Sequence, residues 1–183
     1  PNFLRDCDSE DCDWRAAATR GDYSARVVLK ALQESYAIAG KPNDGAEASE
    51  SIRDVTALAD FAQRVLEYQR IDNSPWNVLI AGVEIPAVLS DIIPDAPIVQ
   101  ELRASAAAIL YDSANKLFDE QGMIQARHFP WYAAILATWT RCYAAVRRKQ
   151  LNLKLKKGFI NHFEWAVRQL LICSNGNRGI TSL

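Results

Sequence analysis

The apolar residues of this chain recur at helical spacing in one segment after another. The cleanest case is a stripe with steps of 3, 4, 3 and 4 residues, which puts all of its members on one face of a helix: Ile52, Val55, Ala59, Ala62 and Leu66. A single apolar stripe of this kind becomes buried by packing against another helix. The spacing therefore predicts helix-on-helix packing and does not suit a sheet.

Glycine and proline are sparse, 8 and 7 of 183 residues, and they gather at the breaks between such segments. The breaks predict helices over residues 22–39, around 52–66, and over 76–92, 98–120, 130–149 and 159–173. Ser74 is the expected N-cap of the third helix, with Pro75 at its first position, and Pro86 predicts a kink or break near Ile85. Helices in consecutive pairs predict an all-α fold of helical hairpins, arranged as a toroid or a solenoid.

The composition excludes several classes of protein. Hydrophobic residues make up 49% of the chain, which is enough for a real core, and 21 basic against 22 acidic side chains leave a net charge of -1. That balance argues against binding nucleic acid through overall charge. No apolar run reaches the roughly 18 residues of a membrane span. No spacing of His, Asp, Glu or Cys predicts a metal site, and no motif predicts a cofactor.

The first 20 residues are expected to be an acidic leader before the helical domain of residues 21–183. Cys7 and Cys12 are close together there. As a zinc site the pair is a weak signal, because no histidine is nearby. The two cysteines could also form a local disulfide in an oxidising compartment or remain free thiols. Because the chain starts with Pro1 and its only methionine is Met123, we expect a processed protein or a piece of a longer one. The turn-like end, residues 175–183, leads us to expect that the protein continues on the C-terminal side.

The stretch from Gly122 to Tyr132 is the most informative for function. It lies between two strongly helical segments, carries His128, and ends in Pro130-Trp131-Tyr132 at the start of the next helix. A polar, aromatic and titratable cluster at a loop-to-helix junction is a typical place for chemistry on a helical scaffold.

Three stretches of the chain together resemble the helical N-terminal domain of the heparinase II/III-like polysaccharide lyases. They are residues 23–40, which form a long helix with tyrosines and end in glycine, residues 74–82 (SPWNVLIAG), and residues 120–132 (EQGMIQARHFPWY). The resemblance implies an incomplete (α/α) toroid that cleaves uronic-acid glycans by β-elimination. It also implies a periplasmic or secreted protein.

The resemblance assigns roles to seven residues. In β-elimination a neutral donor stabilises the charge that builds up on the carboxylate, and a tyrosine or histidine transfers the proton. The predicted catalytic residues are Asn77, His128 and Tyr132, the last on condition that nearby cations lower its pKa. The predicted substrate-binding residues, in the same two junctions, are Trp76, Gln125, Arg127 and Trp131.

Departures from the family pattern leave a second interpretation open. Phe129 and Ala133 stand where the family has Ser and His, and a later histidine that the family uses has no counterpart here. The alternative is a non-catalytic helical module that binds a carbohydrate or a protein, and a weaker one is a scaffold for protein partners. The lyase interpretation predicts that Asn77, His128 and Tyr132 converge on one cleft. The binding interpretation predicts an aromatic and basic groove without them.

Three further features have plain structural interpretations beside functional ones. The basic stretch 147–157 could line a groove for an anionic glycan, form a short amphipathic strand, or be a solvated rim. Trp139 and Trp165 are better explained by core packing than by ligand contact. His162, near a helix start, is expected to be structural.

Overall fold

The computed structural model describes residues 13–19, 24–40, 48–68, 74–148, 151 and 155–176. Within these residues all regular structure is helical, apart from one isolated antiparallel bridge between Phe118 and Ile124. The all-α prediction is confirmed. In this same part of the chain, none of the helices is both long and apolar enough to cross a membrane.

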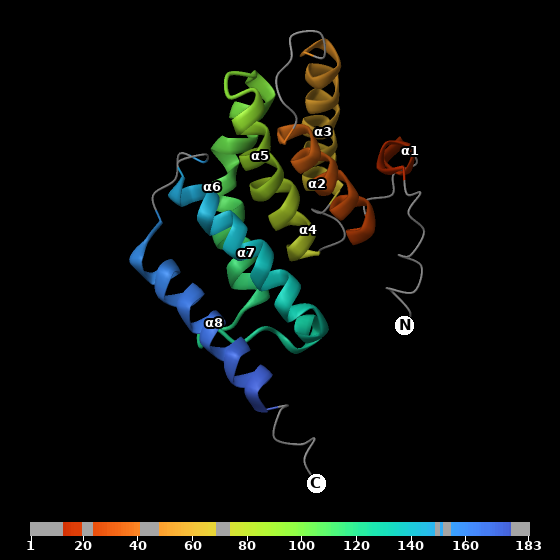
Figure 1. Ribbon diagram of the computed structural model, residues 1–183. Coiled ribbons are helices and arrows are strands. Elements are labelled where there is room, and N and C mark those ends of the chain that lie inside the picture. Colours follow the sequence, from red (N-terminus) through yellow and green to blue (C-terminus); the bar gives the residue numbers. More distant parts are fainter. Residues whose placement is uncertain are drawn as a thin grey trace.

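Ten helical elements follow one another along the described part of the chain (Figure 1): α1 (Trp14–Thr19), α2 (Ala25–Ala39), α3 (Ala48–Tyr68), α4 (Pro75–Leu79), η2 (Ile80–Glu84), α5 (Ile85–Ile92), α6 (Pro97–Leu117), η3 (Ala126–Trp131), α7 (Tyr132–Arg147) and α8 (Lys157–Gly176). The continuous segment formed by α4, η2 and α5 lies at the centre, where η2 contacts α2, α3, α6 and α7. Helix α8 lies outermost, against α7.

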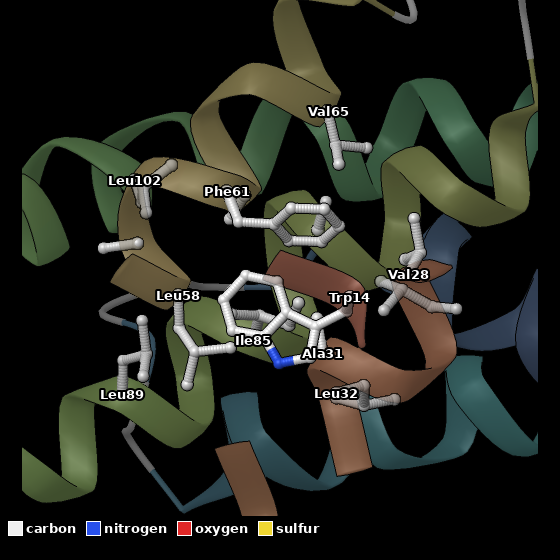
Figure 2. Close-up of a cluster of buried hydrophobic side chains, with 14 of the residues drawn as sticks. Trp14, Val28, Ala31, Leu32, Leu58, Phe61, Val65, Ile85, Leu89 and Leu102 are labelled. Carbon is white, nitrogen blue, oxygen red and sulfur yellow. The ribbon is translucent and has the colours of Figure 1, made fainter. Parts of the chain in front are cut away.

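Two apolar clusters form the core. The first joins α1, α2, α3, α5 and the start of α6, and Figure 2 shows Trp14, Leu58, Phe61 and Ile85 meeting within it. The second joins α4, the rest of α6, α7 and α8, and in it Trp139 contacts Phe118, Phe159 and Phe163. Trp76 packs against both clusters, so the first turn of α4 lies at the seam between them.

The last part of the expected acidic leader, residues 13–19, is folded and includes helix α1. Trp14 on α1 is buried, stands edge-on to Phe61 at a centroid distance of 5.1 Å, and donates its indole N–H to Glu34. Arg15 pairs with Glu34 and, at 2.9 Å, with Asp54. The burial of a large aromatic side chain stabilises this short helix, although the residues before it are acidic. Cys7 and Cys12 lie outside the described residues.

The central segment begins as predicted and is interrupted just before Pro86. The hydroxyl of Ser74 accepts the backbone N–H of Asn77, and Pro75 is the first helical residue, which confirms the cap. The expected break near Ile85 takes the form of the π-helical turn η2, in which the N–H of Ile85 bonds the carbonyl of Ile80. Proline has no N–H to continue the α-helical ladder, so the backbone before it adopts a wider turn.

Several boundaries differ from the prediction because tertiary contacts end or extend helices. Helix α6 stops at Leu117, since Phe118 is extended and pairs with Ile124, although its backbone N–H still donates to the carbonyl of Ala114. Residues 126–131, expected to be mostly loop, form a 3-10 helix. The cap of α2 is Ser24, and residues 22–23 of the predicted helix lie outside the described residues. In the basic stretch 147–157, residues 149–150 and 152–154 also lie outside the described residues, and Leu151 is buried.

The two tryptophans expected in the core have different outcomes. Trp139 is buried and central, as predicted. Trp165 on α8 is 48% exposed, so its assignment to the core is wrong. Both residues lie in apolar helical patterns, and only the packing of α8 against α7 decides which face of α8 is covered. His162 has a structural contact, because its ring nitrogen bonds the carbonyl oxygen of Asp119 at 2.6 Å.

Candidate functional site: an aromatic pair beside a buried ion pair

A tight turn places the junction between α6 and α7. The Asp119 carboxylate accepts the backbone N–H groups of Gln121 and Met123 at 2.9 and 2.8 Å. Gly122 follows with a φ of 75°, in the left-handed region that glycine adopts without strain. A Cβ on Gly122 would lie 2.7 Å from the backbone nitrogen of Ala166, so the turn fits closely against α8.

Tyr132 begins α7 with its hydroxyl turned inward. The hydroxyl donates to the carbonyl oxygen of Ala166 at 2.7 Å and lies 3.3 Å from that of Gly122. Burial raises the pKa of Tyr132 to about 12, and the charges of Cys173 and Asp119 act in the same direction. The predicted role required cations that lower this pKa, and the structure raises it instead. Tyr132 therefore ties α7 to α8 and to the Gly122 turn.

His128 and Arg127 lie together in η3. The Nε–H of Arg127 donates to Nε2 of His128 at 3.1 Å, which leaves the proton of a neutral imidazole on Nδ1. Burial, and then the charge of Arg127, lower the pKa of His128 below its usual value. At neutral pH the pair thus presents a neutral imidazole beside an exposed guanidinium.

Asn77 and Gln125 are held in other ways. Asn77 is buried in the first turn of α4, where its backbone N–H bonds the cap. The backbone N–H of Gln125 donates to the carbonyl of Leu117 at 2.9 Å, which fixes the start of η3, while its side chain is half-buried. Tyr132 faces α8, His128 contacts Arg127, and Asn77 is in the core. The predicted catalytic side chains thus have three different surroundings.

Trp76 and Trp131 lie against each other. Their rings stack with centroids 6.2 Å apart and planes inclined by 30°, and both are partly exposed. The indole N–H of Trp76 donates to the hydroxyl of Thr138 at 3.0 Å. The starts of α4 and α7, which carry the predicted site residues, are therefore in contact through this aromatic pair.

The most unusual group in the structure is Glu84, which the sequence pattern did not single out as functional. It is 1% exposed, at the end of the π-helical turn. Arg141 on α7 pairs with it through Nε and, at 3.3 Å, through Nη2, and Tyr36 on α2 donates its hydroxyl at 2.9 Å. The Nη2 of Arg141 also lies 3.1 Å from the hydroxyl of Thr138. Polar contacts thus run from Trp76 to Thr138, Arg141, Glu84 and Tyr36.

The electrostatics of this cluster follow from burial and mutual charge. Burial raises the pKa of Tyr36, and the charge of Glu84 and the hydrogen bond to it raise it further. Burial alone would lower the pKa of Arg141, but the hydrogen bond and charge of Glu84 outweigh it and raise the pKa. Cys142, fully buried next to the pair, has its thiol pKa raised by burial and by Glu84. The cluster therefore holds one negative and one positive charge and keeps its other groups neutral.

A signal for Glu84 was present in the sequence. It is the single charged residue in the otherwise apolar run from Val78 to Ser90, and it directly precedes the helix break before Pro86. Charged residues are almost never fully buried unless they are paired, and π-helical turns recur at functional sites. Its partner could not be read from the sequence, because Arg141 lies 57 residues away.

The described residues offer two other observations on ligands. No group of three or more His, Cys, Asp or Glu side chains among them could hold a metal ion. A pocket of about 190 Å³ lies between α3 and α6, with the carboxylates of Glu67 and Glu101 in its lining. The two negative charges would repel an anionic ligand, so this pocket is unsuited to the acidic ligands that a basic site would bind.

Comparison of the chain with protein-family models, with curated proteins and with solved structures gave no match. The function is therefore inferred from the geometry of the described residues.

Proposed function

We propose that the chain is a helical binding module for an acidic, uronic-acid glycan, built as an incomplete (α/α) toroid of helical hairpins. The observation that supports it best is the stacked pair of Trp76 and Trp131, 6.2 Å apart and partly exposed, at the end of the 3-10 helix that carries Arg127. Indole rings stack on the apolar faces of sugars, and a guanidinium binds a carboxylate through two parallel N–H groups. The site combines these two chemistries.

The positions of the two groups suit a chain of sugar rings. Arg127 precedes Trp131 by four residues in the same short helix. Its guanidinium is exposed and donates to the neutral His128, so its positive charge is not neutralised by that contact. The rings bind the sugar body, and Arg127 selects ligands with a carboxylate.

The non-catalytic form of the proposal rests on Tyr132. A tyrosine whose hydroxyl is buried and donates to a backbone carbonyl, with a pKa of about 12, is poorly suited to transfer a proton at neutral pH. The lyase is kept as a second candidate because His128 is neutral and has a lowered pKa, as a general base requires. In that case the protein would act like the heparinase II/III-like lyases in the periplasm or outside the cell.

Intrinsic tryptophan fluorescence tests the binding proposal. Titration with heparan sulfate or alginate oligosaccharides is expected to change the emission of the wild-type protein, and Trp131→Ala and Arg127→Gln are expected to weaken binding at least about tenfold, the loss of roughly 1.4 kcal/mol. Trp165→Ala, an exposed tryptophan on α8, is the matched control and is expected to bind as the wild type does. Equal binding by all three variants would refute the proposed site.

The same mixtures distinguish the two candidates. A lyase releases an unsaturated uronate that absorbs in the ultraviolet, whereas a binding module leaves the glycan intact. Binding without a rise in absorbance supports the proposal. A rise that is lost in His128→Ala and kept in Tyr132→Phe would instead support a lyase that uses His128 as its base.

A further inference from the structure

Glu84, Arg141 and Tyr36 form a hydrogen-bonded cluster, here called the Glu84 cluster. Two of these three residues reach solvent, so the exposed edge of the cluster can bind a ligand. The side chain of Arg141 is 43% exposed and Tyr36 is 44% exposed, while Glu84 between them is buried. Tyr36 comes from α2 and Arg141 from α7, and η2 contacts both helices. The buried carboxylate thus fixes the positions of two exposed polar groups from separate helices.

The free hydrogen-bonding capacity of this edge is of both kinds. Arg141 uses Nε and Nη2 on Glu84 and Thr138, and its remaining nitrogen, Nη1, carries two further N–H donors. Tyr36 uses its proton on Glu84, so its oxygen can accept. A donor on α7 and an acceptor on α2 are therefore both held by the same buried carboxylate. A hydroxyl group, which donates and accepts, satisfies both, whereas a carboxylate only accepts.

Charge leads to the same class of ligand. The positive charge of Arg141 is already balanced by Glu84, which is buried next to it. A second carboxylate at this edge would share one guanidinium with Glu84, and like charges at such short range disfavour each other. A neutral hydroxyl meets no such repulsion. The edge is therefore suited to alcohol groups and unsuited to anions.

The edge is joined to the aromatic pair through Thr138, which is buried and contacts both Trp76 and Arg141. Trp131 at the end of η3 and Ala134, Thr138 and Arg141 on α7 follow one another at steps of 3, 4 and 3 residues, which puts them along one side of this segment. Ten residues at 1.5 Å each span about 15 Å, the length of a few sugar rings. Ala134 is exposed and small, so it leaves room between Trp131 and Arg141.

We propose that Tyr36 and Arg141, held in place by Glu84, form a subsite for the neutral hydroxyl groups of a sugar, at the opposite end of the Trp76–Trp131 platform from Arg127. This inference rests on the proposed glycan binding and makes it directional. The carboxylate of one sugar binds Arg127, and the hydroxyl edge of another binds Tyr36 and Arg141. Glu84 is a positioning residue, because it is buried and acts through its two neighbours.

The test uses NMR signals that report on each part of the site separately. The indole N–H signals of Trp76 and Trp131 and the Nε–H signals of Arg127 and Arg141 are followed during titration with a hyaluronan tetrasaccharide. They are followed again with its carboxyl-reduced counterpart, in which each carboxylate is a primary alcohol. Arg141 is expected to shift with both probes, and Arg127 with the acidic probe only. Tyr36→Phe is expected to weaken binding of the reduced probe roughly threefold to tenfold, the effect of one neutral hydrogen bond.

Each outcome bears on one proposal or the other. Shifts of the indole signals without Arg141 would overturn the hydroxyl subsite and leave the glycan platform in place. An Arg141 shift that disappears on carboxyl reduction would overturn it too, because the subsite would then bind the anion. Shifts of Arg141 alone would support the subsite and refute the platform, and no shift of any signal would refute both. Tyr68→Phe, at an exposed tyrosine at the end of α3, is the control for Tyr36→Phe and is expected to bind unchanged.

Discussion

Removing Arg141 and removing Glu84 are predicted to affect stability unequally, although the two side chains form one ion pair. Arg141→Met leaves the carboxylate of Glu84, 1% exposed, without its cation. Glu84→Met leaves the guanidinium of Arg141, whose side chain is 43% exposed and can be hydrated. A buried charge without its partner is strongly destabilising, whereas Glu84→Met leaves no buried charge, because the remaining guanidinium reaches water.

The contacts set the magnitude. Arg141→Met removes the contacts of Nε and Nη2 with Glu84 and that of Nη2 with Thr138. Loss of the partner of a fully buried charge destabilises a protein by about 3–5 kcal/mol. Glu84 keeps the hydroxyl of Tyr36 at 2.9 Å, and water can enter where the exposed part of Arg141 was, so we expect roughly 2–3 kcal/mol. For Glu84→Met we expect a change within about 1 kcal/mol.

Urea unfolding followed by far-ultraviolet circular dichroism measures both changes. For a slope of about 1–3 kcal/mol per molar urea, Arg141→Met lowers the midpoint by roughly 1 M and Glu84→Met leaves it nearly unchanged. The double variant is expected to match Glu84→Met, with a coupling energy of roughly 2 kcal/mol between the sites. If Glu84→Met destabilises the protein as much as Arg141→Met does, the uncompensated buried charge is not the main cause of the lost stability and the reasoning is refuted.

Three further predictions concern the α6–α7 junction. Gly122→Ala should lower the unfolding free energy by at least about 2 kcal/mol, because the φ of Gly122 is 75° and the new Cβ would lie 2.7 Å from a backbone nitrogen. Gly158→Ala, whose Cβ would have nothing within 4 Å, is the control and should not lower it. Equal thermal midpoints of the two variants would contradict this prediction. Tyr132 has a folded-state pKa raised from 10.0 to about 12, so its contribution to stability is complete below pH 10 and is lost as the pH rises toward 12. Tyr132→Phe should therefore lose stability less steeply over that range in urea titrations, and parallel curves would count against this assignment. Arg127→Gln should raise the NMR titration midpoint of His128 toward its usual 6.5, and an unmoved midpoint would leave burial as the sole cause.

The candidate site could be predicted from the sequence only in part. The starts of α4 and α7 stood out because tryptophan, proline and titratable residues cluster there, and the structure brings Trp76 and Trp131 of these two junctions together. The roles of single residues were less predictable. Tyr132 at a helix start has the same local sequence whether its hydroxyl faces a cleft or α8, and the carbonyl that accepts its proton belongs to Ala166, 34 residues later.

The sequence by itself determined the helices and their breaks. The 3-and-4 spacing of apolar residues, the Ser74-Pro75 cap and the interruption before Pro86 all act over a few residues, so local backbone and side-chain preferences are sufficient to predict them. These preferences predict the all-α class and the place of the π-helical turn, although not its form.

Only the tertiary structure decided which side chains are buried and with what partners. Trp14 in an acidic segment became core, and Trp165 in an apolar helix became surface, because burial depends on which helices cover which faces. The pairing of Glu84 with Tyr36 and Arg141 joins residues 48 and 57 positions apart. A charged side chain is buried only where another helix places an oppositely charged side chain beside it. That placement depends on how the helices pack and not on any one segment.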